Sequence, residues 1–441
     1  MNHVFGNRPE TVLRSRPTKS SGGKHVLMGT WLNVLQIQGD WLFVEKRDRS
    51  KQGWVHRQDI TETSPLKIFY VDVGQGDGAI VESPQGLILI DGGPNRGYYD
   101  YLKKRAQPVV DAGDGPVHIH ALVVSHPDDD HFQGFTRLLE DRNFTFGRIY
   151  HNGIIRYHRD AGKDLDLGRL RRRTIDGSAV DVLTETYDGI DDVRRLVDRE
   201  PLMTRFRQFW SAALKARDDG RLRHGCRRVT NRMATLPGFS GQAQDGLRVE
   251  VLGPVPTRAS GRVELVGFPS PENPQGGPSA SHTINGHSIV LKLLFGKYTF
   301  LFAGDLNIPA QNYLISRYGA TNPFRCDVAK ACHHGSSDFT VDYLKKVRPR
   351  ATVFSSGEAR LHDHPLPDAL GAATRHSRGN YPLLFSTELA RTPIGAGFHY
   401  GHINARTNGK QLTMAQKKEK PGLKDPWESF AVPFHGRFRH R

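Results

Sequence analysis

The chain has 441 residues, of which 37% are hydrophobic and 24% are charged. This length predicts two or three folded units, and the composition is that of a globular protein. No apolar run approaches the ~20 residues that span a bilayer, and the first thirty residues carry no secretory signal, so we expect a cytoplasmic protein without a membrane segment. Lysine and arginine exceed aspartate and glutamate by 62 to 46, a net charge of +16. This excess favours a polyanionic partner such as nucleic acid, and a solvated basic surface is the alternative.

Residues 1–63 show short β-type runs that alternate with turns, which predicts a small all-β domain. The sequence Gly-Asp-Trp-Leu-Phe-Val at 39–44, a charged turn and Gly-Trp-Val-His at 53–56 resemble a bacterial SH3-like domain. The resemblance implies a barrel that binds a peptide, a cell-wall fragment or a partner protein. Trp41 and Trp54 could line such a groove, or both could fill the small core.

Residues 64–415 are predicted to form a second, larger domain, because apolar runs bounded by glycine are typical of buried strands. These runs lie at 68–73, 79–81, 87–90 and 122–124. Two hairpins are expected, one across 289–303 and one around Asn408-Gly409. The pattern predicts a layered α/β fold or a β-rich sandwich.

Within this domain, residues 141–245 are predicted to be an arginine-rich helical insertion. Apolar residues recur there at i, i+3, i+4, i+7 and i+8: Phe206, Phe209, Trp210, Ala213 and Leu214. The arginines of the insertion could form a basic wall for a polyanion or could lie on a solvated helix face. By composition, 269–281 is a loop and 416–441 is a loose basic tail.

The segment 123–134, Val-Val-Ser-His-Pro-Asp-Asp-Asp-His-Phe-Gln-Gly, carries the strongest chemical signal. A buried strand ends here and a helix begins, so His126 and His131 converge with up to three carboxylates on one turn. Many like charges in one loop are costly, and a divalent cation is the usual remedy. An acidic helix cap would use some of these carboxylates but would not need both histidines.

The spacing His126-x-Asp128-x-Asp130-His131 resembles the signature of metallo-β-lactamase-fold hydrolases. Five motifs occur in the order seen in the soluble nuclease-like domain of ComEC competence proteins: Asp-Val-Gly-Gln-Gly-Asp at 72–77, Ile-Asp-Gly-Gly at 90–93, Ser-His-Pro-Asp at 125–128, Phe-Ala-Gly-Asp at 302–305 and His-His-Gly-Ser at 333–336. The resemblance implies an α/β fold, the αββα metallo-β-lactamase sandwich, that follows the SH3-like domain and contains the helical insertion.

The resemblance also implies a site for two divalent ions, zinc or manganese. It assigns His126 and Asp128 to one ion and Asp130 with His131 to its neighbour. Asp305 would supply the bridging carboxylate. One of two adjacent histidines, His333 or His334, would supply the final imidazole. Two further carboxylates are expected behind the ligands, and they are Asp77 and Asp91.

The chain departs from the family where a further histidine ligand is usual, in the segment 281–288. Its two histidines, His282 and His287, do not fall at the family spacing, so either could substitute or both could lie on a solvated loop. His364 corresponds to a Gly-His-Pro segment of ComEC-like relatives. It could contact a substrate oxyanion, act as an acid or cap the next helix.

These features favour hydrolysis by a water activated between two metal ions, with Asp130 and His364 as catalytic candidates. The ComEC-like motifs and the positive charge favour a nuclease or phosphodiesterase that acts on DNA or RNA. One alternative is the hydrolysis of a small ester, lactone, thioester or peptide-like bond. A second is a non-catalytic scaffold that acts through its SH3-like domain.

Overall fold

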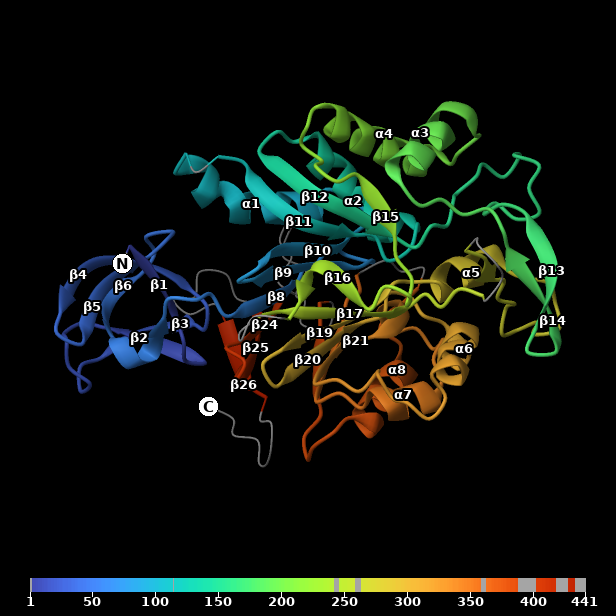
Figure 1. Ribbon diagram of the computed structural model, residues 1–441. Coiled ribbons are helices and arrows are strands. Elements are labelled where there is room, and N and C mark those ends of the chain that lie inside the picture. The colour runs from blue at the N-terminus through green and yellow to red at the C-terminus, as the bar shows by residue number, and fades with distance from the viewer. Residues whose placement is uncertain are drawn as a thin grey trace.

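The computed structural model describes residues 2–113, 115–241, 246–257, 263–357, 362–387, 402–417 and 427–432. Two β-sheets lie face to face, helices cover both outer faces, and an all-β region lies at one end of the molecule (Figure 1). The predicted α/β sandwich with an N-terminal all-β region is therefore confirmed. No helix among the described residues is both long and apolar enough to cross a membrane.

The N-terminal region is one antiparallel sheet in the order β3-β2-β6-β5-β4-β1-β7. Its strands are β1 (His3–Gly6), β2 (Glu10–Arg14), β3 (Gly23–Leu27), β4 (Trp31–Gln38), β5 (Trp41–Lys46), β6 (Gln52–His56) and β7 (Ile60–Thr61), with a short 3-10 turn at Arg57–Asp59. Alternate positions of the strands build the core, including Leu13, Leu32, Leu42 and Val55.

Trp41 and Trp54 lie half-buried on the other face of this sheet. The ring of Trp54 is 5.3 Å from that of Phe43, and the ring of Trp41 is 5.1 Å from that of His56. The expectation that both tryptophans fill the core is therefore wrong, because the strand alternation places them opposite the buried leucines and valines. Their use as a recognition groove stays a prediction.

The first sheet of the sandwich has the order β15-β12-β11-β10-β9-β8-β24-β25-β26. Its strands are β8 (Leu66–Tyr70), β9 (Gly78–Ser83), β10 (Gly86–Gly92), β11 (Val117–Val123), β12 (Phe144–His151), β15 (Cys226–Arg228), β24 (Ile403–Thr407), β25 (Leu412–Lys417) and β26 (Trp427–Ala431). The strands β10, β11, β12 and β15 run parallel. The hairpin predicted around Asn408-Gly409 is confirmed by the pairing of β24 with β25.

The second sheet has the order β16-β17-β19-β20-β21-β22-β23. Its strands are β16 (Thr235–Ser240), β17 (Arg248–Gly253), β19 (Val290–Phe295), β20 (Tyr298–Phe302), β21 (Val328–Lys330), β22 (Ala351–Phe354) and β23 (Leu383–Ser386). The predicted hairpin of β19 and β20 is confirmed, with Phe295 opposite Tyr298. The strands β20 to β23 run parallel.

Apolar side chains of both sheets form one core between them, to which Ile68 of the first sheet and Leu293 of the second belong. The first sheet is covered on its outer face by α1 (Gly97–Asp111), α2 (Asp129–Glu140) and α4 (Thr204–Asp218), and the second by α6 (Ile308–Tyr318), α7 (Val341–Val347) and α8 (Pro367–His376) (Figure 1). The carboxyl ends of β10, β11, β20 and β21 carry the loops that form the candidate site, as parallel strands commonly do.

The predicted insertion 141–245 is helical only in part. The helix expected from its apolar period is α4, and α3 (Ile190–Arg199) packs beside it. The strands β12 and β15 belong to the first sheet, so the boundaries 141 and 245 do not enclose a purely helical segment. A hairpin of β13 (Leu170–Ile175) and β14 (Ser178–Leu183) pairs with β18 (Leu265–Val266).

The arginines of the insertion do not form a single helix face. Arg171, Arg172 and Arg173 lie on β13, not on a helix. Several arginines have carboxylate partners at 2.6 to 2.8 Å: Arg172 with Asp181, Arg173 with Glu264, Arg194 with Asp218 and Arg205 with Asp129. Much of the positive charge is therefore neutralised locally, which weakens the expectation of a continuous basic wall.

The predicted loop and tail are only partly as expected. Residues 269–279 carry no helix or strand, and α5 (Ala280–Gly286) then begins after Ser279. The tail expected from residue 416 contains the end of β25 and the paired strand β26, so 427–431 is not loose. Phe430 of β26 has its ring 5.5 Å from that of Phe385, which gives that strand an apolar contact. The lysine-rich segment 418–420 and the final Arg-His-Arg lie outside the described residues.

The all-β region contacts the sandwich beside β8 and β24. Arg406 Nη1 donates to the carbonyl of Met28 at 2.7 Å, and Lys67 Nζ lies 3.3 Å from the carbonyl of Gly29. Lys67 also pairs with Glu82 at 2.7 Å, and Arg105 donates to the same carboxylate. Burial raises the pKa of Glu82, but Arg105 and Lys67 lower it by more, so it lies below its ordinary value.

We expect Glu82→Gln to lower the free energy of unfolding by about 3 kcal/mol at pH 7, because it leaves the buried Lys67 and the partly buried Arg105 without their shared counter-charge. The parent carries this stabilisation above the ordinary pKa of 4.5 and loses it as the pH falls toward the lowered pKa. Urea unfolding at several pH values should therefore show the difference between parent and variant shrinking in acid. The exposed carboxylate Glu62, changed to glutamine, is the matched control, and an equal loss in both variants would contradict the prediction.

Candidate metal centre

Four loops bring the predicted site residues to one edge of the sandwich. Asp128 is the N-cap of α2, so Asp130 and His131 lie in the first turn of that helix. Asp305 follows β20 and His334 follows β21. Gly304 has φ +49° and a Cβ there would lie 2.7 Å from Ser288 Oγ, so glycine permits the turn that directs Asp305 inward.

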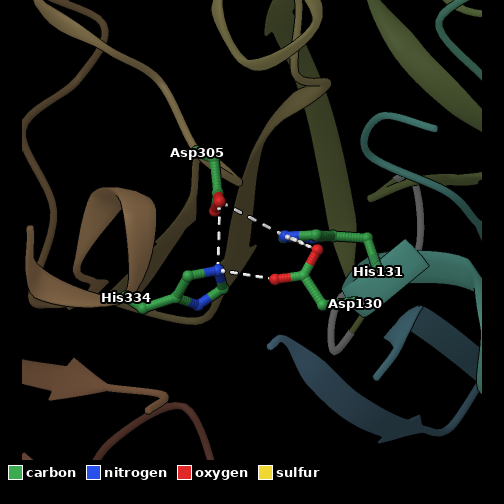
Figure 2. Close-up of side chains that lie close together, drawn as sticks. All are labelled: Asp130, His131, Asp305 and His334. Carbon is green, nitrogen blue, oxygen red and sulfur yellow. Dashed lines mark ion pairs between the residues drawn. The ribbon is translucent and has the colours of Figure 1, made fainter. Parts of the chain in front are cut away.

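Asp130, His131, Asp305 and His334 form a group of four that could hold a metal ion (Figure 2). His334 Nε2 lies 3.0 Å from Asp305 Oδ2 and 3.3 Å from Asp130 Oδ2. His131 Nε2 lies 3.4 Å from Asp305 Oδ2. Each residue offers a donor atom within 4.8 Å of the others, so one ion could contact all four.

The electrostatics of this group fit a cation. The buried Nε2 atoms of His131 and His334 face the carboxylates of Asp130 and Asp305, and the buried Nε2 atom of His126 has no hydrogen-bond partner in the described part of the chain. Burial lowers the pKa of His131 and of His334, but Asp305 above all raises both by more, so both lie well above the ordinary value. The clustered carboxylates thus favour a positive charge beside them, which protonated imidazoles supply. A divalent ion bound by imidazole nitrogens and carboxylate oxygens would supply that charge instead.

Buried hydrogen-bond acceptors fix the orientation of the imidazoles of His131 and His334. Asp91 accepts hydrogen bonds from Ser125 N and Ser125 Oγ, both at 2.7 Å, and lies 3.0 Å from His131 Nδ1. His334 Nδ1 lies 3.0 Å from the carbonyl of Ser355. A proton on each Nδ1 leaves Nε2 free to face the cluster, which is how second-shell carboxylates and carbonyls act in metal sites.

We expect Asp91→Asn to weaken metal binding by about 10- to 100-fold, because His131 loses the carboxylate that orients it. Calorimetric titration of the chelator-treated protein with manganese or zinc measures the change. Asp100→Asn, at the surface of α1 where Asp100 pairs with Arg96, should bind metal like the parent. Unchanged affinity in Asp91→Asn would show that the orientation of His131 does not depend on this carboxylate.

Lys330 is a charged member of the site that the sequence reasoning missed. Its side chain is 3% exposed, it forms an ion pair with Asp77, and its Nζ lies 3.5 Å from Asp305 Oδ1. Asp77, Asp91 and His131 also lie close enough to hold an ion, but Lys330 already supplies a cation to Asp77. The sequence offered one signal for Lys330. It ends a short apolar run just before Cys332 and the His-His-Gly-Ser motif.

The three successive carboxylates of the motif point to different partners. Asp129 Oδ2 accepts from Arg205 of α4 at 2.7 Å and so faces away from the cluster. Asp128 Oδ1 accepts from Arg156 at 2.8 Å, and its Oδ2 lies 3.7 Å from His126 Nε2. Burial raises the pKa of Asp128 to about 6, although Arg156 opposes the change.

Of the adjacent pair, His334 lies within the cluster and His333 lies at its edge. The side chain of His334 is 2% exposed and that of His333 is 28% exposed. His333 Nε2 is 3.9 Å from Asp305 Oδ2, against 3.0 Å for His334. We therefore favour His334 as the ligand.

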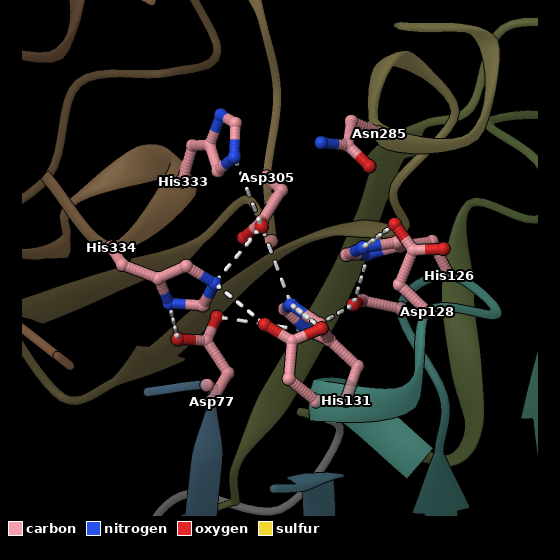
Figure 3. Close-up of polar contacts among 12 residues, drawn as sticks. Asp77, His126, Asp128, His131, Asn285, Asp305, His333 and His334 are labelled. Carbon is pink, nitrogen blue, oxygen red and sulfur yellow. Dashed lines mark hydrogen bonds and ion pairs between the residues drawn. The ribbon is translucent and has the colours of Figure 1, made fainter. Parts of the chain in front are cut away.

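His282 and His287, the two candidates for the further histidine ligand, have partners outside the cluster. His287 Nε2 lies 2.7 Å from the carbonyl of Val266, and burial lowers the pKa of His287 to about 4. His282 Nδ1 lies 3.1 Å from Ser279 Oγ at the start of α5. His287 is buried, so the expectation that both lie on a solvated loop is wrong. Asn285 lies near His126 and Asp305 instead (Figure 3).

His364 lies beside the histidine pair. Its ring is 5.7 Å from that of His333 and 6.2 Å from that of His334, and its Nδ1 is 3.2 Å from Gln75 Nε2. Leu366 is the N-cap of α8, so His364 does not cap that helix. Burial, followed by the nearby histidines His334 and His333, lowers the pKa of His364 to about 4, which favours a neutral imidazole over an acid.

The αββα sandwich and the buried group of histidines and carboxylates define a metal-dependent hydrolase. Residues 71–356 match the family described as the metallo-beta-lactamase superfamily, and the chain belongs to that superfamily.

Individual proteins resemble the chain more distantly. Competence protein ComA of Neisseria gonorrhoeae is 28% identical over 118 residues, which is 26% of this chain and 16% of that protein. The match therefore spans about one sixth of that relative. The metallo-beta-lactamase fold protein YhfI from Bacillus subtilis aligns over 76% of this chain and 98% of its own, with 10% identity and a TM-score of 0.32. CmlA, a diiron beta-hydroxylase from Streptomyces venezuelae, aligns over 79% of this chain and 56% of its own, with 12% identity and a TM-score of 0.34.

Proposed function

We propose that the protein is a metal-dependent nuclease or phosphodiesterase that acts on DNA or RNA. The observation that carries the proposal is a buried donor cluster that opens to solvent along one edge. Side chains of Asp130, Asp128 and His333 are 31%, 28% and 28% exposed, whereas Asp305 is 4% exposed. We infer that the phosphodiester of a substrate would reach the donor cluster at this edge. The net charge of +16, the ComEC-like motif order and the similarity to a competence protein support a polyanionic substrate.

In this proposal, Asp130, His131, Asp305 and His334 hold one ion, and His126 with Asp128 contribute to a neighbouring position. Divalent ions in such sites activate water and stabilise charge on a phosphoryl oxygen. The proposal leaves the identity of the metal, zinc or manganese, to experiment. Donor sets rich in carboxylate oxygen admit manganese as well as zinc.

The side chains of the protein have separate tasks in the proposed reaction. We assign Asp130 the role of accepting a proton from the attacking water, because its carboxylate lies at the exposed edge of the cluster where that water would arrive. If Gln75 donates to His364 Nδ1, the proton of that neutral imidazole is on Nε2, where it can donate a hydrogen bond to a substrate oxygen. Lys330 balances the charge of Asp77 and Asp305 and so keeps the carboxylate cluster buried.

The test is cleavage of labelled single- and double-stranded DNA and RNA in manganese, zinc or chelator. The parent is compared with Asp128→Ala plus Asp130→Ala, and with Asp129→Asn as the matched control because Asp129 faces Arg205. Cleavage that needs metal, is lost in the double variant and survives in the control supports the proposal. If the parent binds metal but cuts no nucleic acid, the phosphodiester proposal fails, and small esters, lactones, thioesters and peptide-like bonds become the substrates to screen.

Other sequence-based predictions stay predictions. The division into an SH3-like domain at 1–63 and a catalytic domain at 64–415 is a proposal, as are a peptide or protein partner of the former and a cytoplasmic location. A purely scaffolding role is disfavoured by the donor cluster. Retention of stoichiometric metal after dialysis would argue further against it.

A further inference from the structure

Arg156 connects the segment after β12 to the predicted metal ligands. Its side chain is 14% exposed, and its Nη1 donates to Asp128 Oδ1 at 2.8 Å. Its Nη2 lies 3.3 Å from Met203 Sδ and 3.7 Å from Asp166 Oδ2. A nearly buried guanidinium is therefore held in place against the carboxylate that the motif assigns to a metal ion.

The two candidate metal positions differ in the number of donor atoms that are free to bind an ion. The position of Asp130, His131, Asp305 and His334 has four donors close together. The neighbouring position has His126 Nε2, with Asp128 Oδ2 at 3.7 Å, but the other oxygen of Asp128 already accepts from Arg156.

A neutral oxygen lies beside the weaker position. Asn285 is buried, and its Oδ1 has no hydrogen-bond partner in the ranges that the structure describes. Ser288 Oγ bonds the carbonyl of Asn285 at 2.8 Å and lies 3.2 Å from His126 Nδ1, so this segment is fixed beside His126. Figure 3 shows the side-chain oxygen of Asn285 directed toward His126 and Asp128. An amide oxygen is a weaker ligand for zinc than the imidazole usual in the family.

We propose that Arg156 is a built-in cation that competes with a metal ion for Asp128, so that the two metal positions bind with different affinities. The position at Asp130, His131, Asp305 and His334 is the tight one. The position at His126, Asp128 and Asn285 is the weak one, and it fills only when the ion overcomes the charge of Arg156. The inference does not depend on the substrate proposed above.

The physical reason is the balance of charge on Asp128. A partly buried carboxylate that loses the guanidinium bonded to it is left with less compensation, and a divalent ion then binds to it more strongly. An ion that binds while Arg156 is present gains less from the same carboxylate and is repelled by the guanidinium. If Arg156 merely oriented Asp128 for the metal, its removal would weaken binding instead. The sign of the effect therefore separates the two roles.

The test is a calorimetric titration of the full chain, freed of metal by chelator, with manganese or zinc alone, together with metal analysis after dialysis. The parent is expected to show one tight and one weak ion. In Arg156→Met the weak ion should bind at least about tenfold more tightly, and the tight ion should be unchanged. Arg156→Gln provides a second, polar variant if the methionine variant does not fold, and Arg156→Lys, which keeps the charge, should resemble the parent.

Two controls locate the effect. Arg205→Met removes a neighbouring arginine–carboxylate pair outside the donor cluster and should leave both ions unchanged. Asp128→Asn should abolish only the weak ion. The proposal is overturned if the second ion binds more weakly or equally in Arg156→Met and Arg156→Gln, if Arg205→Met has the same effect, or if Asp128→Asn loses both ions.

Discussion

Asp305→Asn is expected to lower metal-dependent hydrolysis by at least about 10³-fold, which corresponds to about 4 kcal/mol of transition-state stabilisation. Asp305 Oδ2 lies within 3.4 Å of Nε2 of both His131 and His334, and the side chain is 4% exposed. An amide keeps the shape but loses the charge that draws the ion and the imidazoles together. Tight metal binding should therefore be lost along with the activity.

Metal content by elemental analysis and initial rates on a phosphodiester such as bis(p-nitrophenyl) phosphate measure both effects. Asp129→Asn is the matched control, because it removes one negative charge from the same region without touching a proposed ligand. Retention of tight metal and of more than about a tenth of the activity in Asp305→Asn would remove Asp305 from the ligand set.

Phe132→Ala is expected to lower the free energy of unfolding by about 4 kcal/mol. Phe132 is 1% exposed and its ring lies 5.3 Å from that of Phe209 and 6.4 Å from that of Phe206. It therefore joins α2, the helix that begins with the metal motif, to α4. The cavity left by its removal would loosen the first turn of α2, so metal should also bind more weakly.

Denaturant unfolding followed by tryptophan fluorescence measures the loss. Val341→Ala is the control, because Val341 is 46% exposed and a surface truncation should change stability by no more than about 0.5 kcal/mol. A loss below about 1 kcal/mol for Phe132→Ala would mean that α2 does not depend on this contact.

Local patterns predicted the elements with a clear period. The runs at 87–90 and 122–124 became β10 and β11, and the apolar stripe from Phe206 to Leu214 became the buried face of α4. The candidate cluster was predictable because five motifs occur in one order, although each alone is ambiguous. The strand β15 was missed because three residues give no measurable alternation.

Contacts between side chains from distant segments could not be predicted from the sequence. Successive residues at the start of a helix are rotated by about 100°, so Asp128, Asp129 and Asp130 face different partners, and no pattern says which of them faces inward. Arg156 and Asp128 are 28 positions apart, and only packing brings them together. Lys330 was missed because a buried lysine has no sequence signature apart from its neighbours.

The strand order of the first sheet has a consequence for biosynthesis. β8 lies between β9 and β24, and β24 begins at Ile403, more than three hundred residues after β8 ends at Tyr70. While the chain is still being translated, β8 has an unpaired edge, a common starting point for aggregation. The nascent protein must therefore keep this edge protected until the ribosome has released β24 to β26, and a premature stop codon before Ile403 would leave it exposed permanently.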